Sequence, residues 1–126
     1  MFIVRREVAK TIRTKAIDQA KLRAKERDSY TCQKNPNHTG QMHGSHIIPV
    51  GAGGIIAADP DNIITLCASC HKLAGDSWHE APLEQQWFHK KFPGRYDRLK
   101  AKHETRPIKK YEWQEIYDKL KVENET

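Results

Sequence analysis

The fold is decided by two short runs of sequence, Gly44-Ser45-His46-Ile47-Ile48-Pro49 and, after a glycine-rich bend, Asp61-Asn62-Ile63-Ile64-Thr65-Leu66-Cys67-Ala68-Ser69-Cys70-His71. Both runs lie between residues 32 and 82, where all three cysteines and five of the seven histidines are found. Side chains that bind metals are rarely gathered into one part of a chain for packing alone. We therefore expect this segment to be a small active site organised by metal, held in a frame formed by the rest of the chain.

The size and composition of the chain favour one small domain stabilised by a metal. The chain has 126 residues, of which 37% are hydrophobic, so it can bury only a modest core. Three cysteines cannot all pair in disulfides, and two of them form Cys-x-x-Cys, which indicates zinc or redox chemistry in a chain without a secretion signal. We expect a single domain over residues 1–126, with a basic N-terminal helix (1–31), a metal core (32–82) and a helical C-terminal extension (83–126).

Positive charge is concentrated on both sides of the expected metal core. The net charge is +6, and Lys and Arg outnumber Asp and Glu by nine to four in residues 1–31 and by eleven to eight in residues 81–126, but not in residues 32–80. Basic segments around a metal-binding centre are typical of proteins that bind nucleic acid. A net charge of +6 would also increase solubility, whatever the partner. The N-terminal residues become charged too early for a signal peptide and no apolar run is long enough to span a membrane, so we expect a cytoplasmic protein without a membrane partner.

The spacing of apolar residues predicts helices at both ends and two short strands in the middle. It predicts a helix over 4–28, strands over 42–50 and 63–66 joined by a loop over 51–62, and a short helix that opens at His71. Further helices are expected from 82 to a break at 92–94, around 96–99 and over 113–120, with 123–126 frayed. The expected core aromatics are Trp87, Phe88, Trp113 and Tyr117, whereas His89 and His103 are expected in solvent.

The motif Cys67-Ala68-Ser69-Cys70-His71 allows three interpretations. It matches the attachment motif of c-type haem, which the polar surroundings disfavour, and it matches a dithiol redox motif, which usually follows a long apolar strand in a βαβ unit. The third interpretation is a tetrahedral zinc bound by Cys67 and Cys70 and by two ligands from an earlier knuckle. In that knuckle Cys32 and His38 are the natural partners, with His43 as the fallback, and such a closed site would be structural.

The zinc interpretation leaves His46, His71 and His79 without a role. His46 ends a strand, Asn62 lies beyond the glycine-rich loop and His71 opens a helix, so strand, strand and helix form a compact ββα unit. This arrangement suits phosphodiester hydrolysis, in which a neutral imidazole takes a proton from water and a divalent cation stabilises charge at phosphorus.

At these positions the sequence resembles the HNH endonucleases of the ββα-metal class. The shared pattern is a strand-end His before Ile-Ile-Pro, a Gly-Gly loop, Asp-Asn and then Leu-Cys-x-x-Cys-His, and it covers roughly residues 30–100. The segment Trp78-His79-Glu80-x-Pro82-Leu83 is similar to a phage and prophage branch that includes the NinG/Rap recombination nucleases and small phage HNH endonucleases. The resemblance implies a mainly helical α+β fold with a ββα-metal core, a structural zinc knuckle and flanking helices, and it implies a metal-dependent DNA endonuclease.

The resemblance also assigns roles to individual residues. It implies that His46 is the general base and that Asn62 holds the loop and orients His46 through hydrogen bonds. It further implies that His71 binds the catalytic divalent metal. His79 would be a second ligand or a contact to the scissile phosphate, unless it only caps the helix that follows.

One position departs from the family pattern. Many family members have Asp or His immediately before the base, and that residue binds the catalytic metal, but this chain has Ser45. A hydroxyl is a weak ligand for a divalent cation, which leaves three possibilities. Ser45 binds the metal weakly or through water, His43 or His79 takes its place as a ligand, or the nuclease activity is low. The expected cofactors are a structural Zn²⁺ and a catalytic Mg²⁺, Mn²⁺, Ni²⁺ or Zn²⁺.

The expected partner is DNA, either duplex or branched. The basic residues expected to contact its phosphates are Arg5, Arg13, Lys72, Lys90, Lys91 and Arg95. A second copy of the chain and phage packaging or recombination proteins are further candidate partners, and a phage-encoded protein would act in the host-cell cytoplasm. The alternative interpretation, which Ser45 favours, is a non-catalytic zinc-stabilised module that binds nucleic acid.

Overall fold

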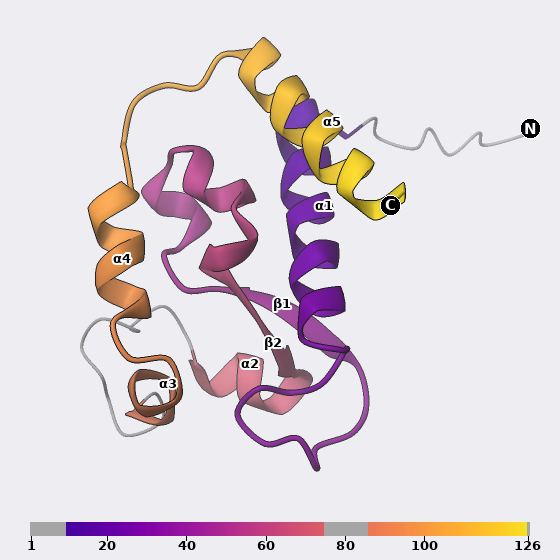
Figure 1. Ribbon diagram of the computed structural model, residues 1–126, viewed down its shortest axis with the longest axis vertical. Helices are drawn as coiled ribbons and strands as arrows, with labels where there is room; N and C mark the ends of the chain where they lie inside the picture. The colour runs from indigo at the N-terminus through magenta and orange to yellow at the C-terminus, as the bar shows by residue number, and fades with distance from the viewer. Residues whose placement is uncertain (1–9, 75–85, 126) are drawn as a thin grey trace, which may run out of the picture.

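Helices make up most of the chain, and a pair of strands lies at its centre (Figure 1). The computed structural model describes residues 10–74 and 86–125. In chain order the elements are α1 (Ile12–Arg27), β1 (Met42–His46), η1 (Val50–Ala52), η2 (Ile55–Ala58), η3 (Pro60–Asn62), β2 (Ile63–Cys67), α2 (Ala68–Ala74), α3 (Gln86–Lys91), α4 (Arg95–Lys102) and α5 (Lys110–Glu125). The fold is mainly helical α+β, as the sequence predicted. Within the described residues, no helix combines the length and the apolar character needed to cross a bilayer.

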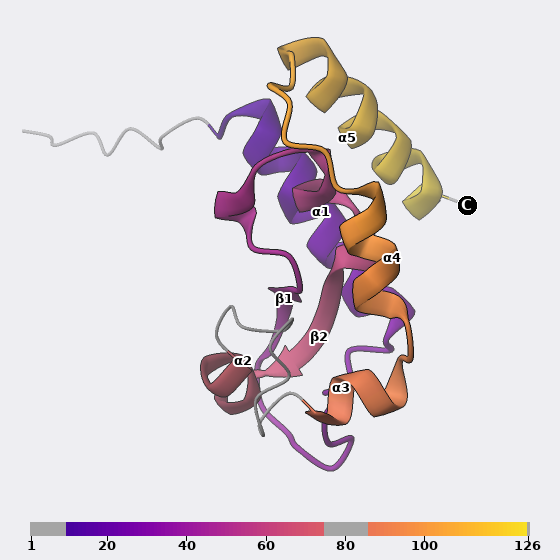
Figure 2. The same ribbon diagram turned by 90° about the vertical axis from the view of Figure 1, so that its left-hand side faces the viewer.

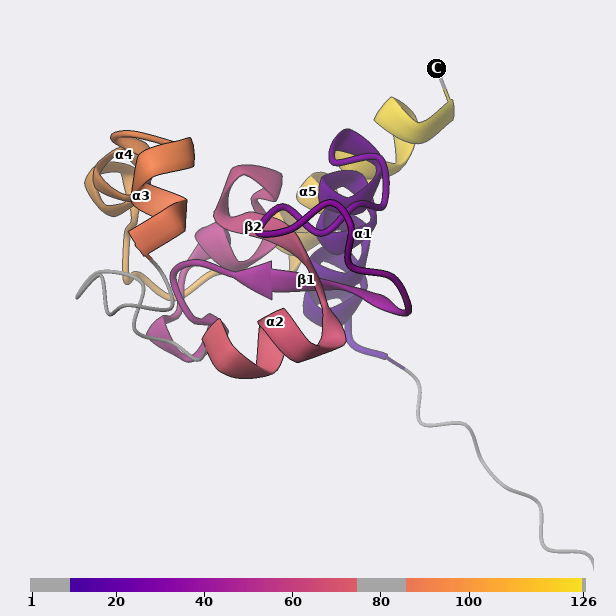
Figure 3. The same ribbon diagram turned by 90° about the horizontal axis from the view of Figure 1, so that it is seen from below.

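The two strands lie between two groups of helices. The views agree that α1 and α5 lie side by side on one side of the sheet and that α3 and α4 lie on the other (Figures 1, 2 and 3). The strands pair antiparallel along their full length, from Met42 opposite Cys67 to His46 opposite Ile63. Helix α2 follows β2 directly and runs back along β1 (Figure 3). The end of β1 and the face of α2 are thereby brought together.

Each side of the sheet has its own hydrophobic core. Between α1 and α5, the small side chains of Ala16, Ala20 and Ala24 are completely buried and pack with Trp113 and Leu120. The core on the other side consists of Ile47, Ile48, Ile56, Ile64, Leu66, Phe88 and Leu99 together with the three cysteines. Phe88 and Trp113 are buried, and Trp87 and Tyr117 pack against these cores, which confirms the predicted core aromatics.

The first helix begins later than the sequence predicted. Lys10 and Thr11 precede it in non-helical conformation, and the Thr11 hydroxyl accepts a hydrogen bond from the main-chain N–H of Thr14 at 3.2 Å. This bond caps the helix and so sets its first residue at Ile12. Apolar spacing alone does not detect such a cap, and residues 4–9 of the predicted helix lie outside the described residues.

The strand and helix boundaries around the core also differ from the prediction. The first strand ends at His46 rather than at residue 50, because the N–H groups of Ile47 and Ile48 donate to the main-chain and side-chain oxygens of Asn62 at 2.8 and 2.7 Å. The predicted loop over 51–62 contains most of three 3₁₀ helices. Helix α2 begins at Ala68, three residues before the predicted start. Helix α5 continues to Glu125, within the segment predicted to fray, and residue 126 lies outside the described residues.

The glycine-rich loop packs closely against the segment after α4. Gly54 has φ +81°, and a Cβ atom built there would lie 2.1 Å from the main-chain oxygen of Glu104, so a larger residue does not fit. Beside it, His103 Nε2 donates to the main-chain oxygen of Gly53 at 3.1 Å. His103 is therefore half-buried rather than in solvent, and the half-buried His89 likewise packs against the rings of Phe88 and Tyr96.

Candidate metal centre and catalytic cavity

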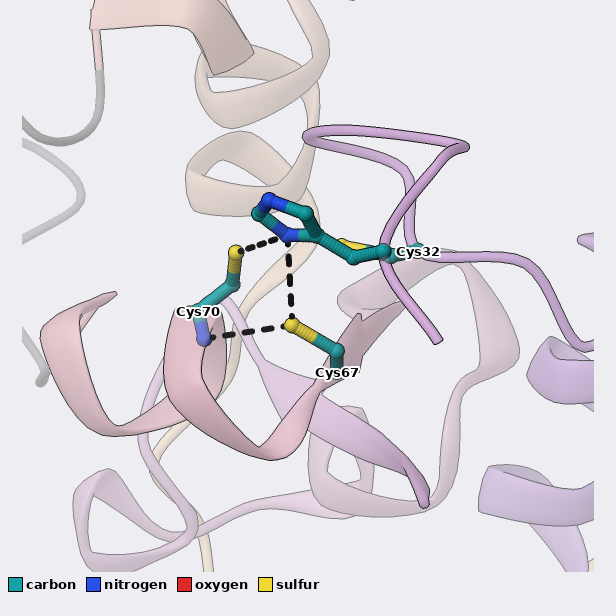
Figure 4. A group of neighbouring side chains, drawn as sticks. Cys32, Cys67 and Cys70 are labelled. Atoms are coloured by element: carbon teal, nitrogen blue, oxygen red, sulfur yellow. Dashed lines mark hydrogen bonds between the residues drawn. The ribbon is translucent and has the colours of Figure 1, made fainter. Parts of the chain in front are cut away.

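Cys32, His38, Cys67 and Cys70 come together at one end of the sheet (Figure 4). Their ligand atoms all lie within 4.8 Å of one another, and His38 Nδ1 is 3.5 Å from Cys67 Sγ and 3.3 Å from Cys70 Sγ. Cys67 ends β2, Cys70 lies in the first turn of α2, and Cys32 follows the turn that ends α1. The structure thus groups the four residues that the sequence predicted, with His38 rather than His43 as the fourth.

The chemistry of this cluster fits a tetrahedral Zn²⁺. The main-chain N–H of Cys70 donates to Cys67 Sγ at 3.5 Å. Burial raises the pKa of Cys32, but N–H donors of Cys67, Asn35 and Lys34 outweigh it and lower the pKa to about 7, which favours the thiolate that a metal needs. Burial and the two neighbouring sulfurs raise the pKa of Cys70 to about 12. Three thiolates this close repel one another, and a bound cation removes that repulsion.

A cavity of about 380 Å³ lies beside the end of β1, between this strand, the glycine-rich loop, α1 and α2. Its lining residues are Lys21, Gly44, Ser45, His46, Pro49, Val50, Gly51 and His71. Three of them were predicted from the sequence to serve catalysis, namely Ser45, His46 and His71. Among the described residues that line the cavity none is acidic, so within residues 10–74 and 86–125 its metal-binding atoms are imidazole nitrogens and a hydroxyl oxygen.

The His46 imidazole is fixed in one tautomer by the main chain. Its Nε2 atom lies 2.7 Å from the carbonyl oxygen of Ala57, which can only accept, so Nε2 carries the proton and Nδ1 keeps its lone pair. Burial lowers the pKa of His46 below its ordinary value despite this hydrogen bond, and the positive charges of Lys21 and His71 lower it further. The ring is therefore neutral at neutral pH, which is the state a general base requires.

Asn62 is completely buried and its side chain binds the loop that carries this carbonyl. Its Nδ2 atom donates to the carbonyls of Ile48 and Ile56 at 3.0 and 3.1 Å, and its Oδ1 atom accepts from the N–H of Ile48 at 2.7 Å. All three bonds go to main-chain atoms and none goes to His46 itself. Because Ile56 directly precedes Ala57, Asn62 acts on the orientation of His46 through the loop.

His43 and His71 face each other across the gap between β1 and α2. Their Nδ1 atoms are 2.9 Å apart, and their rings meet edge to face with centroids 5.1 Å apart. Ser45 lies opposite Ile64 in the sheet and is only 2% exposed. From the sequence, His43 was expected only as a substitute ligand. The signal that could have found it is the two-residue alternation of a strand, which places His43 and Ser45 on the same face of β1.

Lys21 is a cavity residue that was not predicted from the sequence. It comes from α1, where it looked like one of many charges on a solvated face. Its side chain crosses β1 at Gly44, where an added Cβ would lie 2.9 Å from Lys21 Cγ and 3.1 Å from Ile63 Cγ2. Glycine at position 44 thus lets the helix approach the strand and brings a cation to the cavity.

The basic residues predicted to contact DNA are placed in different ways. Lys72, Lys90 and Lys91 are exposed, although Lys91 Nζ donates to the main-chain oxygen of Gln33 at 2.8 Å. Arg13 is exposed and its guanidinium lies 5.8 Å from the centre of the Trp113 ring. Arg5 and His79 lie outside the described residues.

Arg95 is largely engaged with its own chain. Its guanidinium donates to the main-chain oxygens of Asp61 and Ile63 at 2.9 to 3.2 Å and lies 4.8 Å from the centre of the Phe92 ring. Burial lowers its pKa to about 10, with the nearby charge of Arg27 adding to the effect. These contacts attach α4 to the start of β2, and a contact between Arg95 and DNA stays a prediction.

Comparisons with known proteins agree with the geometry of the site. A protein-family model described as HNH endonuclease matches residues 30–77, which include the cysteine cluster and most of the cavity. The chain is also similar to Anaredoxin from Nostoc sp. (strain PCC 7120 / SAG 25.82 / UTEX 2576), with 38% identity over 53 residues, or 42% of this chain and 67% of that protein. No solved structure matches the chain. Helices α1, α3, α4 and α5 lie outside the matched family segment.

Proposed function

The chain belongs to the HNH endonuclease family through residues 30–77, and from this premise we propose that it is a metal-dependent endonuclease that hydrolyses DNA phosphodiester bonds. The observation that carries the proposal is the hydrogen bond from His46 Nε2 to Ala57 at 2.7 Å. It supplies a neutral imidazole with an available Nδ1 lone pair, in a cavity that His71 also lines. Those are the two groups that water activation beside a bound cation requires.

In the proposed reaction His46 Nδ1 accepts a proton from a water molecule as the water oxygen attacks phosphorus in line. The bond from phosphorus to the 3′ oxygen breaks, which leaves a 5′-phosphate and, after protonation, a 3′-hydroxyl. Lys21 adds positive charge at the cavity where the phosphate would lie. A divalent cation held by His71, with His79 and Ser45 as the further expected ligands, would stabilise negative charge on the phosphate and the leaving oxygen.

We propose that the remaining parts of the chain hold this site and bring it to DNA. Zn²⁺ bound by the cysteine cluster would be structural, because four protein ligands leave no open position for water. Residues 1–126 would form a single nuclease domain, and the exposed side chains of Arg13, Lys72, Lys90 and Lys91 would meet DNA phosphates. A phage or prophage origin is part of the same proposal; it depends mainly on residues 78–83, which lie outside the described residues.

The test is a cleavage panel on supercoiled plasmid and branched DNA with Mg²⁺, Mn²⁺, Ni²⁺ or Zn²⁺, with EDTA as the metal-free control. We expect His46→Ala to reduce the cleavage rate by at least about 100-fold, since a positioned base contributes about 10² to 10⁴. DNA binding should stay unchanged and the variant should remain folded, with a lower melting temperature because the Ala57 carbonyl loses its partner. The matched control is His89→Gln, a histidine outside the cavity, which should cleave like the native protein. Cleavage by His46→Ala at the native rate would refute the mechanism.

The alternative is a non-catalytic, zinc-stabilised module that binds nucleic acid. It is favoured by the 2% exposure of Ser45, which stands where a stronger ligand is usual. It is also favoured by the cavity lining, which has no carboxylate within the part of the chain that the structure describes. Binding to DNA without nicking in any metal of the panel would establish this alternative.

A further inference from the structure

A basic pocket lies between α4 and η3, apart from the catalytic cavity. Its volume is about 250 Å³, and its lining residues are Asp61, Arg95, Arg98, Leu99 and Lys102. Among the described residues, it shares no lining residue with the catalytic cavity. The pocket is formed by α4, whereas the catalytic cavity is formed in part by α1, which lies on the other side of the sheet (Figure 2).

The three cations of this pocket lie on one face of α4. Arg95, Arg98 and Lys102 are three and four residues apart, a spacing that places side chains on the same face of an α-helix. Like charges at this spacing repel one another and destabilise a helix. Some interaction of the folded protein must therefore offset the repulsion along this face.

Two of the three cations also connect α4 to the turn before β2. The guanidinium of Arg95 donates through Nε and Nη2 to the main-chain oxygen of Asp61 at 3.0 and 2.9 Å. Lys102 Nζ lies 2.7 Å from a carboxylate oxygen of Asp59 and 3.4 Å from one of Asp61. These contacts fix the positions of Arg95 and Lys102 at the pocket, and the two carboxylates neutralise part of its charge.

Arg98 is the cation of the pocket that has no carboxylate partner within the described residues. It is exposed, and its Nη1 atom donates to the main-chain oxygen of Pro93 at 3.4 Å. A Cβ atom added at Gly94 would lie 3.4 Å from the same Nη1 atom, so the side chain folds back toward the start of α4, where Arg95 begins the helix.

The electrostatics of Arg95 show that cations crowd this part of the molecule. Burial lowers the pKa of Arg95 to about 10, and the positive charges of Arg27 and Arg98 lower it further. The charges of the lining are three positive and one negative, with Asp59 as a second carboxylate beside Lys102. An anion bound in the pocket would reduce the repulsion between the cations.

We propose that this pocket binds a phosphate group, with Arg98 as its main ligand and with Arg95 and Lys102 adding positive charge. Guanidinium N–H groups match the spacing of phosphate oxygens, so arginine suits this ligand better than a point charge does. The phosphate belongs either to the DNA backbone or to a free phosphate compound, since both present the same oxygens. Only the assignment to DNA rests on the proposed function; the site itself rests on the geometry of the pocket.

Isothermal titration calorimetry with inorganic phosphate, at constant ionic strength and without added divalent metal, tests the site. We expect Arg98→Gln to weaken phosphate binding by at least about 10-fold, because hydrogen bonds between charged groups are among the stronger ones. The matched control is Lys100→Gln, which removes the same charge from an exposed position of the same helix outside the pocket. It should bind phosphate like the native protein.

A second variant should strengthen the binding. The side chain of Asp61 is 73% exposed, so Asp61→Asn should fold while removing the negative charge from the lining. We expect it to bind phosphate up to about 5-fold more tightly, which is the size of one charge interaction near the surface. If the cations served only to connect α4 to η3, this substitution would bring no gain in phosphate affinity.

Binding of duplex DNA over a series of salt concentrations, measured by fluorescence anisotropy, distinguishes the two sources of phosphate. A site for the DNA backbone predicts that Arg98→Gln weakens DNA binding and reduces the salt dependence by about one phosphate contact. A site for a free phosphate compound predicts that Arg98→Gln and Lys100→Gln bind DNA alike.

The outcomes separate this inference from the proposed function, because neither assay uses cleavage. The inference is overturned if the native protein does not bind phosphate, or if Arg98→Gln binds it like the native protein or like Lys100→Gln. Metal-dependent cleavage by the native protein in that case leaves the nuclease intact. Conversely, phosphate binding that Arg98→Gln loses, together with no cleavage in any metal, supports the pocket and overturns the nuclease.

Discussion

Replacing Asn62 by alanine removes the side chain that ties the loop between the strands together. The amide is fully buried and makes three hydrogen bonds, two to Ile48 and one to Ile56. In the alanine variant one N–H and two carbonyls lose these partners inside the protein. The variant therefore loses the free energy that it costs to leave buried main-chain polar groups unpaired. This cost is larger than the net contribution of the same hydrogen bonds to the stability of the native protein.

The expected loss of stability follows from these three bonds. Each buried main-chain group left unpaired costs about 1–3 kcal/mol, and water entering the space left by the amide offsets part of that cost. We expect Asn62→Ala to lower the free energy of unfolding by about 3–5 kcal/mol, a large share of the roughly 5–15 kcal/mol typical of small proteins. Cleavage should also fall in molecules that remain folded, because the Ala57 carbonyl that orients His46 belongs to the same loop.

Urea unfolding followed by circular dichroism measures this loss, with zinc kept in excess. The matched control is Asn37→Ala, an asparagine on the exposed knuckle, which should change the free energy of unfolding by less than about 0.5 kcal/mol. A loss below about 1 kcal/mol for Asn62→Ala would show that the amide does not hold the loop. Native cleavage by the folded variant would show that the loop does not orient His46.

Three further changes test other parts of the structure. Cys67→Ser should release zinc in elemental analysis and lower the melting temperature by roughly 10 °C or more, because zinc-binding energy is also folding energy; retained zinc and an unchanged transition would contradict a structural role. Gly54→Ala should destabilise the fold by at least about 2 kcal/mol through its left-handed backbone and the overlap with Glu104, whereas Gly51→Ala, which meets nothing within 4 Å, should be close to neutral in the same unfolding assay. The cleavage rate should fall on acidification with a midpoint below pH 6.5, because burial lowers the pKa of His46 and the ring stays neutral until the pH falls through that lowered value; a midpoint above 6.5 would refute this.

The cysteine cluster could be predicted from the sequence because its chemistry leaves few alternatives. Two cysteines at Cys-x-x-Cys spacing need two more soft ligands, and Cys32 with His38 were the nearest candidates upstream. The structure groups these four residues within 4.8 Å. The second strand was predicted from its isoleucine-rich run, which begins β2 at Ile63. The first strand was predicted from Ile47 and Ile48, which lie just beyond the end of β1 at His46, so its existence was predicted better than its bounds.

The contacts of the cavity could not be predicted because they depend on the relative placement of separate elements. Lys21 reaches the cavity only because α1 crosses β1 at a glycine, and His43 meets His71 only because α2 runs back along β1. Arg95 is predicted to contact DNA because its sequence neighbourhood is basic, and its contacts within the chain were not predicted. Its burial against the carbonyls of Asp61 and Ile63 depends on where α4 docks, which no periodicity in the sequence specifies.

The cysteine cluster and the cavity are coupled because they share α2. Cys70 and His71 are consecutive residues of this helix, which spans only Ala68–Ala74 and is far too short to be stable by itself. Its position relative to β1 must therefore come from tertiary contacts. The strongest candidate is a metal that joins Cys70 in its first turn to Cys32, His38 and Cys67. A zinc ion there would fix the distance between His43 and His71 without touching either ring. Loss of DNA cleavage in Cys67→Ser, under conditions where the variant is still folded, is the result that this coupling requires.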